Sequence, residues 1–296
     1  MITIFTPTYN RANMLEKLYE SLIVQTDQNF NWIIIDDGSI DDTQKRVEKW
    51  KKNLNITYIY QANQGKHIAI NTALKNCNTD YLMCVDSDDT LKSDAVAFIN
   101  RITKNKINKE IWAIVGPRVH SDGSLSKEWL SKDDNVCKFA DIYGKYKYEG
   151  ETYIIMNHRY VKDFTFPCFK NEKLVPENVM YDFFDNNFYI KTISEKKYVS
   201  EYQNDGYTKN NSKLLFNSPN GVALSNISSS CNKNNSFFKR VKSYTRFLVI
   251  KKEFLKNSKK NFNVMNNKLS VSSFVKLFSL FLYPLFLLHY KKKKES

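Results

Sequence analysis

The chain of 296 residues is poor in glycine and proline, with only 8 and 6 of them. Collagen-like and glycine-rich designs are therefore excluded, and no internal repeat with a solenoid period is visible. The five cysteines are odd in number and scattered, without CxxC or Cys/His spacing. This pattern argues against a disulfide framework or a zinc site, and we expect reduced thiols in a cytosolic protein.

The sequence also shows no pattern typical of a targeting segment or of a glycine-rich phosphate loop. The N-terminus has no basic region followed by an apolar segment, so we expect no export signal. The uncharged stretch from Leu277 to Leu288 has 12 residues and contains Pro284, whereas a membrane-spanning helix needs about 20. The first strand-to-helix turn, "TPTYNRAN", contains no glycine, which excludes the GxGxxG and P-loop motifs. A phosphate bound here needs another partner, such as a metal held by carboxylates.

The net charge of +14 lies at one end of the chain. The segment from Lys233 to Ser296 carries 16 basic and two acidic side chains, and residues 1–232 are neutral. A neutral body argues against nucleic acid as a partner. A basic tail with an apolar end favours an anionic membrane surface. The alternative is a C-terminal helix docked on the protein's own core. The expected apolar face of the first tail helix contains Phe237, Val241, Tyr244, Leu248 and Leu255.

The first part of the chain alternates apolar strands with amphipathic helices. We expect strands at 2–5, 32–37, 56–60, 81–86 and 111–116, and helices at 14–24, 41–50, 67–76 and 93–102. This alternation predicts an α/β fold with a Rossmann-type, mostly parallel sheet and helices on both faces. Ligands of such sheets bind outside the carboxyl ends of the strands. The polar segments expected there are 6–10, 36–39, 63–66 and 86–89.

One of these segments follows a buried strand with three aspartates in four positions. The stretch "YLMCVDSDDT" ends an apolar run at Asp86, Asp88 and Asp89. Unpaired buried carboxylates are costly, and a divalent cation such as Mg²⁺ or Mn²⁺ would offset that cost. The alternative is a solvated loop in which one aspartate caps the next helix or turn.

Taken together, the ordered motifs resemble the family-2 glycosyltransferases, inverting sugar transferases with the GT-A fold. The resemblance rests on "TPTYNR", "QTDQNFNWIIIDDGSIDDT", "NQGKHIAIN" and "DYLMCVDSDDTL", in this order between Thr6 and Leu91. A looser match through "FPCFKNEKLVPENVMYDFF" and "EYQNDGYT" resembles the branch that builds bacterial surface polysaccharides. It implies a nucleotide-sugar-binding half at 1–100 and an acceptor-binding half at 101–232. The remaining segment, 233–296, is expected to be a basic helical tail that associates with membranes.

The resemblance also implies roles for residues that match the family's motifs. A floor under the base and ribose is expected from Pro7, Thr8 and Tyr9. Asp37 would accept a hydrogen bond from the base, with Asp36 supporting it. The segment that passes near the base and diphosphate would contain Asn63, Gly65 and Lys66.

A metal site and a catalytic base are implied as well. Asp86 and Asp88 would form the DxD pair for Mn²⁺ or Mg²⁺, with Asp88 as the direct ligand and Asp86 facing the ribose or a metal-bound water. Asp205, in "NDGYT", is either a further ligand or part of a turn. The expected general base is Glu177, which follows Pro176.

Several alternatives to this base stay open. Pro176 and an acid also suit a helix start without catalysis. Asn178 stands where the family usually has the Asp of a Glu-Asp pair, and Glu172 and Asp182 are competing bases. For stacking against an acceptor sugar, the first candidate is Trp129.

The resulting hypothesis is a glycosyltransferase that uses a nucleoside-diphosphate sugar, by resemblance a UDP-sugar. The acceptor would be a hydroxyl of a lipid-linked or growing surface glycan, with inversion and metal assistance, at the cytoplasmic face of the plasma membrane. A nucleotidyltransferase of related fold is one alternative, although it would normally show a glycine-rich basic loop after the first strand. A non-catalytic, membrane-bound carbohydrate-binding protein is the other.

Overall fold

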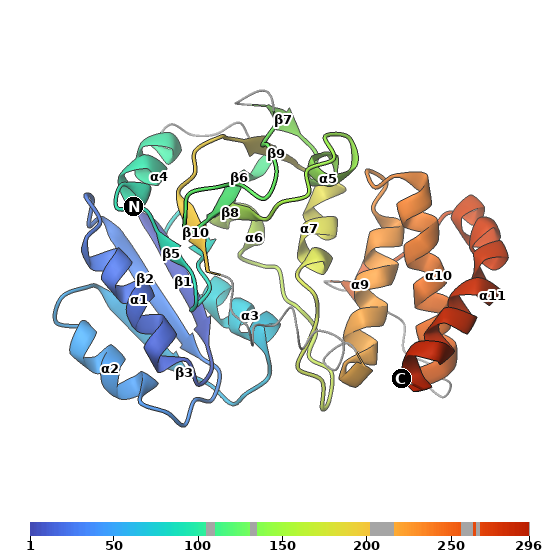
Figure 1. Cartoon of the computed structure of the whole chain (residues 1–296), viewed down its shortest axis with the longest axis horizontal. Coiled ribbons are helices and arrows are strands. Elements are labelled where there is room, and N and C mark those ends of the chain that lie inside the picture. Colours follow the sequence, from blue (N-terminus) through green and yellow to red (C-terminus); the bar gives the residue numbers. More distant parts are fainter. Residues whose placement is uncertain (105–109, 131–134, 202–215, 256–262, 265–266, 296) are drawn as a thin grey trace.

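The computed structural model describes residues 1–104, 110–130, 135–201, 216–255, 263–264 and 267–295. It has an α/β body, with the C-terminal helices attached at the end of the body far from the first strands (Figure 1). The strands are β1 Ile2–Thr8, β2 Phe30–Asp36, β3 Ile56–Tyr60, β4 Tyr81–Cys84, β5 Thr90–Leu91, β6 Ile111–His120, β7 Val136–Cys137, β8 Thr152–Asn157, β9 Tyr189–Thr192, β10 Tyr198–Ser200, β11 Asn263–Val264 and β12 Asn267–Lys268. The helices are α1 Ala12–Ile23, α2 Thr43–Trp50, α3 Lys66–Asn76, α4 Ala95–Thr103, α5 Phe139–Gly144, α6 His158–Val161, α7 Asn178–Asp185, α9 Pro219–Cys231, α10 Phe237–Phe254 and α11 Ser273–Glu295.

The main sheet runs in the order β3-β2-β1-β4-β8-β6-β10-β5 within the described residues, and β9 pairs with β6 and β7. Strands β1 to β4 are parallel, as the alternating pattern predicted. The antiparallel β8, which the sequence pattern did not identify, lies between β4 and β6. Because β8 reverses direction, β6 is again parallel to β4, and both strands end at the same edge.

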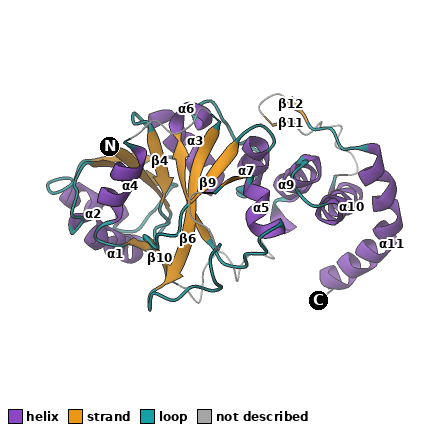
Figure 2. Cartoon of the chain, turned by 90° about the horizontal axis from the view of Figure 1, so that it is seen from above, coloured by secondary structure: helices purple, strands orange, loops and turns teal. Residues whose placement is uncertain are grey.

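Both faces of the sheet are covered by helices (Figure 2). In β2, Trp32 and Ile34 pack with side chains of α1, α2 and α4, whereas Ile33 and Ile35 pack with side chains of α3 and α7. Alternate side chains of a strand point to opposite faces, so a continuous apolar run marks a strand buried on both sides. The predicted fold class, a mostly parallel α/β sheet with helices on both faces, is confirmed.

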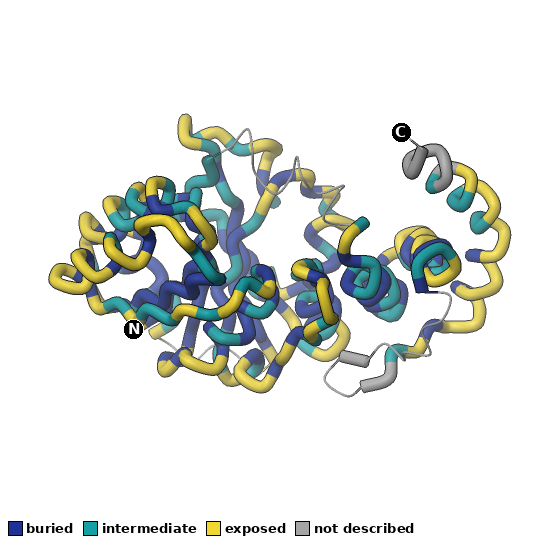
Figure 3. Tube along the Cα trace, turned by 90° about the horizontal axis from the view of Figure 1, so that it is seen from below, coloured by how far each residue is buried: buried dark blue, intermediate teal, exposed yellow. Residues whose placement is uncertain are grey.

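The C-terminal helices form a layer beside α7. Helix α9 packs on α7, and α10 packs between α9 and α11. The apolar face predicted for this part of the tail is largely internal: Val241 and, just after α10, Leu255 are buried, and Tyr244 packs against buried neighbours. Much of α11 is exposed to solvent (Figure 3). Among the described residues, no helix combines the length and apolar character needed to cross a membrane.

Candidate active site

The parallel strands β1, β2, β4 and β6 end at one edge of the sheet, and a cavity of about 870 Å³ lies there. We call it the first cavity. Its lining includes these residues that were singled out from the sequence: Pro7, Thr8, Tyr9, Asp37, Asn63, Gly65, Lys66, Asp86, Asp88, Asp89, Pro176 and Glu177. Residues from five separate segments are thus brought to one surface, as expected for the carboxyl edge of a doubly wound sheet.

Asp37 shapes the loop that borders this cavity. Its Oδ1 accepts hydrogen bonds from Gln61 Nε2 at 2.8 Å and Gln64 N at 3.0 Å, and its Oδ2 accepts one from Gly65 N at 2.7 Å. Gly65 has a φ of +94°, and a Cβ there would lie 1.9 Å from the Lys173 carbonyl oxygen. Only glycine fits that contact, so the approach of the two backbones fixes the rim of the cavity.

Asp36 lies behind the cavity and does not line it. Its carboxylate accepts hydrogen bonds from Tyr58 Oη at 2.6 Å and Ser39 N at 2.7 Å. It therefore holds the end of β2 and the turn that follows, in keeping with the supporting position expected for it.

The three aspartates after β4 point to different partners. Asp88 Oδ2 lies 2.8 Å from Arg11 Nη1 at the cavity surface. Asp89 is buried and accepts hydrogen bonds from Tyr198 Oη at 2.7 Å and Glu201 N at 3.1 Å. Burial and the nearby Asp86 charge raise the pKa of Asp89 to about 7. Asp89 thus ties β4 to the β10 region, and it borders the first cavity together with Asp86 and Asp88.

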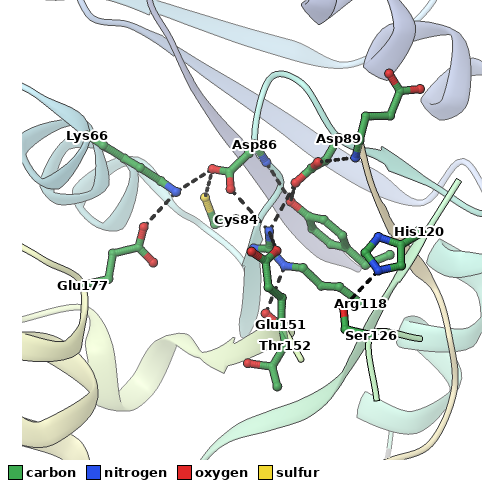
Figure 4. A network of polar contacts seen from close by, with 12 residues as sticks. Lys66, Cys84, Asp86, Asp89, Arg118, His120, Ser126, Glu151, Thr152 and Glu177 are labelled. Carbon is green, nitrogen blue, oxygen red and sulfur yellow. Dashed lines mark hydrogen bonds and ion pairs between the residues drawn. The ribbon is translucent and has the colours of Figure 1, made fainter. Parts of the chain in front are cut away.

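Lys66 connects two of the predicted functional carboxylates. Its Nζ lies 2.6 Å from Asp86 Oδ1 and 2.8 Å from Glu177 Oε1 (Figure 4). Burial opposes the charge of Glu177, but the Lys66 ammonium outweighs burial and lowers the pKa of this carboxyl. Burial also opposes the charge of Asp86, but the positive charges of Lys66 and Arg118 outweigh this effect and lower the pKa of the carboxyl to about 2. Both carboxylates are therefore held in the ionised form.

Arg118, at the end of β6, is a residue that the sequence did not point to. Its Nη1 lies 3.2 Å from Asp89 Oδ2 and 3.6 Å from Asp86 Oδ2, and its guanidinium lies over the Tyr198 ring at 4.1 Å from the centroid. Its Nε donates to the Thr152 carbonyl oxygen at 3.0 Å. A lone arginine after an apolar strand carries no motif, and only the β6–β8 pairing brings it to the carboxylates.

The residues present fit a divalent cation bound together with a substrate. Asp86 and Asp88 offer hard carboxylate oxygens on the surface of the first cavity. Mg²⁺ in such sites uses one or two carboxylates, and substrate phosphates and water supply the rest. Within the described part of the chain, no group of three or more His, Cys, Asp or Glu side chains could hold a metal alone. Asp205 lies outside the described residues.

The three carboxylates named as candidate bases differ in their surroundings. Glu172 accepts hydrogen bonds from Asn220 N at 3.0 Å and Gly221 N at 2.9 Å, so it caps the start of α9. Asp182 is buried and accepts four hydrogen bonds, from Asn178, Ser229, Asn232 and Asn235.

Glu177, by contrast, lies at a junction of two cavities. It lines the first cavity and also a second cavity of about 440 Å³. The residues common to both linings are Lys66, Asp86, Arg118, Glu151 and Glu177. Of the three candidate bases, Glu177 is the one with access to both spaces.

Among the described residues, three aromatic side chains line the second cavity, Phe139, Tyr143 and Tyr181, and the expected Trp129 is not among them. Trp129 is buried in the core, with its ring 4.7 Å from that of Tyr148 in an edge-to-face arrangement, so the expectation that it stacks on a sugar is wrong. Tyr143, on α5, lines the second cavity and is 40% exposed. Composition alone does not separate core aromatic residues from surface ones, so the sequence did not distinguish these two positions.

Curated relatives match only part of this chain. An uncharacterised glycosyltransferase of Rickettsia felis is 37% identical over 95 residues, which are 32% of this chain and 16% of that protein. Poly-β-1,6-N-acetyl-D-glucosamine synthase of Staphylococcus aureus strain MSSA476 is 30% identical over 145 residues, covering 48% of this chain and 34% of the synthase. The chain thus corresponds to a minor part of the length of these relatives.

Solved structures share the fold over most of the chain. Staphylococcus aureus TarS 1–349, solved with UDP-GlcNAc, has a TM-score of 0.59 at 20% identity and covers 87% of this chain and 76% of its own. The mannosyltransferase PcManGT from Pyrobaculum calidifontis, solved with GDP-Man and Mn²⁺, has a TM-score of 0.50 at 16% identity, covering 84% and 68%. The sequence profile described as Glycosyl transferase family 2 matches residues 3–196, more than half of the chain. The chain therefore belongs to glycosyl transferase family 2.

Proposed function

We propose that this protein transfers a sugar from a nucleoside-diphosphate sugar to a hydroxyl of a glycan acceptor, with inversion at the anomeric carbon. The observation that carries this proposal is the position of Glu177 between the two cavities, with Asp86 and Asp88 on the same surface. The donor would occupy the first cavity and the acceptor the second. Neither a nucleotidyltransferase nor a carbohydrate-binding protein needs a carboxylate between a nucleotide site and a second polar cavity.

The transfer is a single displacement. The acceptor oxygen forms a bond to the anomeric carbon while the bond from that carbon to the β-phosphate oxygen breaks, and the nucleoside diphosphate leaves with the electron pair. Glu177 takes the proton of the attacking hydroxyl, which is the task of a general base. The ionised state of Glu177, favoured by its ion pair with Lys66, suits that role.

Asp86 and Asp88 are the residues that would hold Mn²⁺ or Mg²⁺ beside the donor's diphosphate. When bound, the cation supplies positive charge that stabilises the negative charge developing on the leaving diphosphate. The mannosyltransferase of similar fold that was solved with GDP-Man and Mn²⁺ supports this assignment.

A UDP-linked donor is the form that the comparisons favour. The TarS structure of similar fold was solved with UDP-GlcNAc, and the staphylococcal relative is named for N-acetyl-D-glucosamine polymer synthesis. In the first cavity, Pro7, Thr8 and Tyr9 would lie under the base and ribose. Asp37 accepts hydrogen bonds from the 61–65 loop, so its role toward the base would be to shape that loop as well as to contact the ligand.

The acceptor would be a sugar that stacks on Tyr143. This ring lines the second cavity and is held by a hydrogen bond of 3.1 Å between Tyr143 Oη and Thr152 Oγ1. Aromatic faces pack well against the apolar faces of sugar rings. We therefore assign to Tyr143 the role that the sequence had suggested for Trp129.

We also propose that the C-terminal helices hold the protein on an anionic membrane, at its cytoplasmic face, where a lipid-linked glycan would be the acceptor. One stripe of α11 carries exposed apolar side chains, between 48% and 73% exposed: Phe274, Leu277, Phe278, Phe281, Leu285 and Leu288. We call this set the α11 stripe. Val275 and Ser279, on the opposite side of the helix, are buried.

The surroundings of the α11 stripe support a lipid surface as its partner. The segment 233–296 contains all of the net positive charge, and anionic lipid attracts each nearby basic residue by about 1 kcal/mol. The Phe237 ring lies 5.3 Å from that of Phe278, and Phe238 is 80% exposed beside it. The next residue, Lys239, lines the second cavity. The apolar surface therefore begins beside the proposed acceptor site.

Flotation of the full chain with liposomes tests this membrane role. We expect it to float with liposomes that contain anionic lipid and to float much less with purely zwitterionic ones. High salt should weaken the association only in part, because the apolar contribution is not screened. Equal behaviour with both liposome types would contradict the charge argument.

The transferase activity itself is tested by incubating the full chain with UDP-sugars and Mn²⁺ and following the release of UDP. We expect release that increases when a lipid-linked or soluble glycan acceptor is added. The Glu177→Gln variant is the matched control and should show little release. If wild type and Glu177→Gln both bind UDP-sugar and release UDP at the same rate, the proposed base is contradicted.

A further inference from the structure

Both oxygens of the Glu177 carboxylate are engaged within the protein itself. Its Oε1 lies 2.8 Å from Lys66 Nζ, and its Oε2 accepts a hydrogen bond from Tyr181 Oη at 2.5 Å. A general base must lie within hydrogen-bond reach of the proton that it takes. In this arrangement each oxygen already has a strong donor, so an acceptor hydroxyl would compete with the Lys66 ammonium for Oε1.

Lys66 is the partner that a donor substrate can remove. It lines both cavities, and it is the first residue of α3, directly after the tight contact at Gly65. A lysine carries a point charge on a flexible stem, so its ammonium can change partners without movement of the backbone. A diphosphate in the first cavity brings negative charge beside it, at the N-terminal end of a helix.

Two other cations of the site, Arg118 and Arg11, have different partners. Arg118 is fixed by the Thr152 carbonyl, by Asp89 and by the ring of Tyr198. Arg11 pairs with Asp88 at 2.8 Å. Neither forms an ion pair with Glu177 among the described residues, so freeing the base depends on Lys66.

We propose that Lys66 is a positioning residue that pairs with Glu177 until the donor's diphosphate takes its ammonium. The carboxylate then becomes available to the acceptor hydroxyl only when a donor is present. This inference rests on the proposed function, since it assigns the first cavity to a nucleoside diphosphate. It adds an order to the reaction, in which the donor binds before the base can act.

A double-mutant cycle on UDP binding tests the proposal without measuring activity. The affinity of the full chain for UDP, at a fixed Mn²⁺ concentration, is measured by calorimetry for wild type, Glu177→Gln, Lys66→Gln and the double variant. Glu177→Gln should tighten UDP binding about fivefold, because Lys66 no longer has to leave a charged partner. Lys66→Gln should weaken it about tenfold. In the double variant, the gain from Glu177→Gln should disappear.

Two controls separate this coupling from general electrostatics and from misfolding. Uridine, which lacks phosphates, should bind equally to all four proteins. Lys66→Arg keeps the positive charge, so Glu177→Gln should still tighten UDP binding in that background. Thermal unfolding of each variant shows whether it is folded.

The outcomes distinguish this inference from the proposed function. If Glu177→Gln leaves UDP affinity unchanged, or tightens it equally in the wild-type and Lys66→Gln backgrounds, the positioning role of Lys66 is wrong while UDP binding stands. If the wild-type chain binds no nucleoside diphosphate, the proposed donor site is wrong and the role of Lys66 is wrong with it.

Discussion

The sheet edge and the C-terminal segment differ in the balance between basic and acidic side chains. At the sheet edge, Arg11, Lys66 and Arg118 each lie against a carboxylate. The segment 233–296 contains 16 basic and two acidic side chains, and the α11 stripe in the same segment is exposed. In the first region each of these cations is paired with a carboxylate, whereas the second region has a large excess of basic side chains.

This difference indicates two kinds of partner. Opposite charges held against one another in a cavity can exchange partners when a small charged ligand enters, at little net cost in desolvation. A large excess of positive charge in a segment with exposed apolar side chains instead suits a large, flat, anionic surface. In the proposed function, the same residue types would thus serve a small-molecule site in one region and a surface contact in the other.

A buried polar cluster joins the two regions. Asp182 on α7 accepts hydrogen bonds from side chains of α9 and of the turn that follows it. Asp185 accepts hydrogen bonds from Ala140 N at 3.4 Å and Asn232 Nδ2 at 3.0 Å, and so links α5 to the same turn. The C-terminal helices are therefore fixed to the half of the body that carries Glu177.

The largest effect is expected at the sheet edge. Glu177→Gln should lower turnover by about 10²–10⁴-fold, the usual contribution of a positioned base. Donor binding should be retained or improved, because Lys66 is no longer held by a carboxylate at position 177. Steady-state rates with a UDP-sugar and an acceptor check this, and a loss of turnover in Glu172→Gln without one in Glu177→Gln would identify a different base.

The second prediction concerns the C-terminal helices. Replacing Phe274, Phe281 and Leu285 by Ser should weaken binding to anionic liposomes by at least about 10²-fold. Each apolar side chain that becomes buried in the lipid surface contributes roughly 1.5–3 kcal/mol. UDP affinity should stay the same. A matched control replaces three exposed apolar side chains far from the tail, namely Val24, Ile40 and Val136. If the control loses liposome binding equally, the α11 stripe is not the contact surface.

The third prediction concerns the cluster between the regions. Asp182→Asn should destabilise the fold by about 2–4 kcal/mol, because one oxygen that accepts hydrogen bonds becomes a donor facing other donors. Thermal unfolding should show this loss, while UDP binding by the folded protein stays near the wild-type value. A stable Asp182→Asn protein without transferase activity would instead assign catalysis to Asp182.

The smallest effect is expected in the second cavity. Tyr143→Ala should raise the acceptor KM by roughly two- to tenfold, the usual worth of an aromatic contact. The donor KM should not change, and Tyr143→Phe should behave almost like wild type because the ring is kept. An equal rise in the donor KM would show that Tyr143 acts on the whole site and not on the acceptor.

The sequence predicted the β1 to β4 half of the fold and most of the first cavity. Ordered motifs and alternating apolar runs are local signals, and the rule for parallel sheets brings the ends of those strands together. The contact between Lys66 and Glu177 joins residues far apart in the chain, so no local pattern could predict it. Arg118 is brought in by the unexpected strand β8.

The aromatic and tail residues show where composition is insufficient. Trp129 and Tyr143 are both aromatic residues of the second half of the body, yet one is buried and the other lines a cavity. Helix α10 has apolar residues on several faces, which fits a helix packed between two others better than one lying on a membrane. Which of its faces is buried was decided by α9 and α11.

The central claim, a metal-assisted nucleoside-diphosphate site at the sheet edge, is tested most directly by titrating the full chain with UDP in the presence and absence of Mn²⁺. We expect saturable binding that Mn²⁺ strengthens, and we expect Asp88→Asn to abolish both this strengthening and sugar transfer while the protein stays folded. Binding of UDP that is the same with and without Mn²⁺, in wild type and in Asp88→Asn alike, would contradict the metal site. A wild-type chain that binds no nucleoside diphosphate under either condition would contradict the account as a whole.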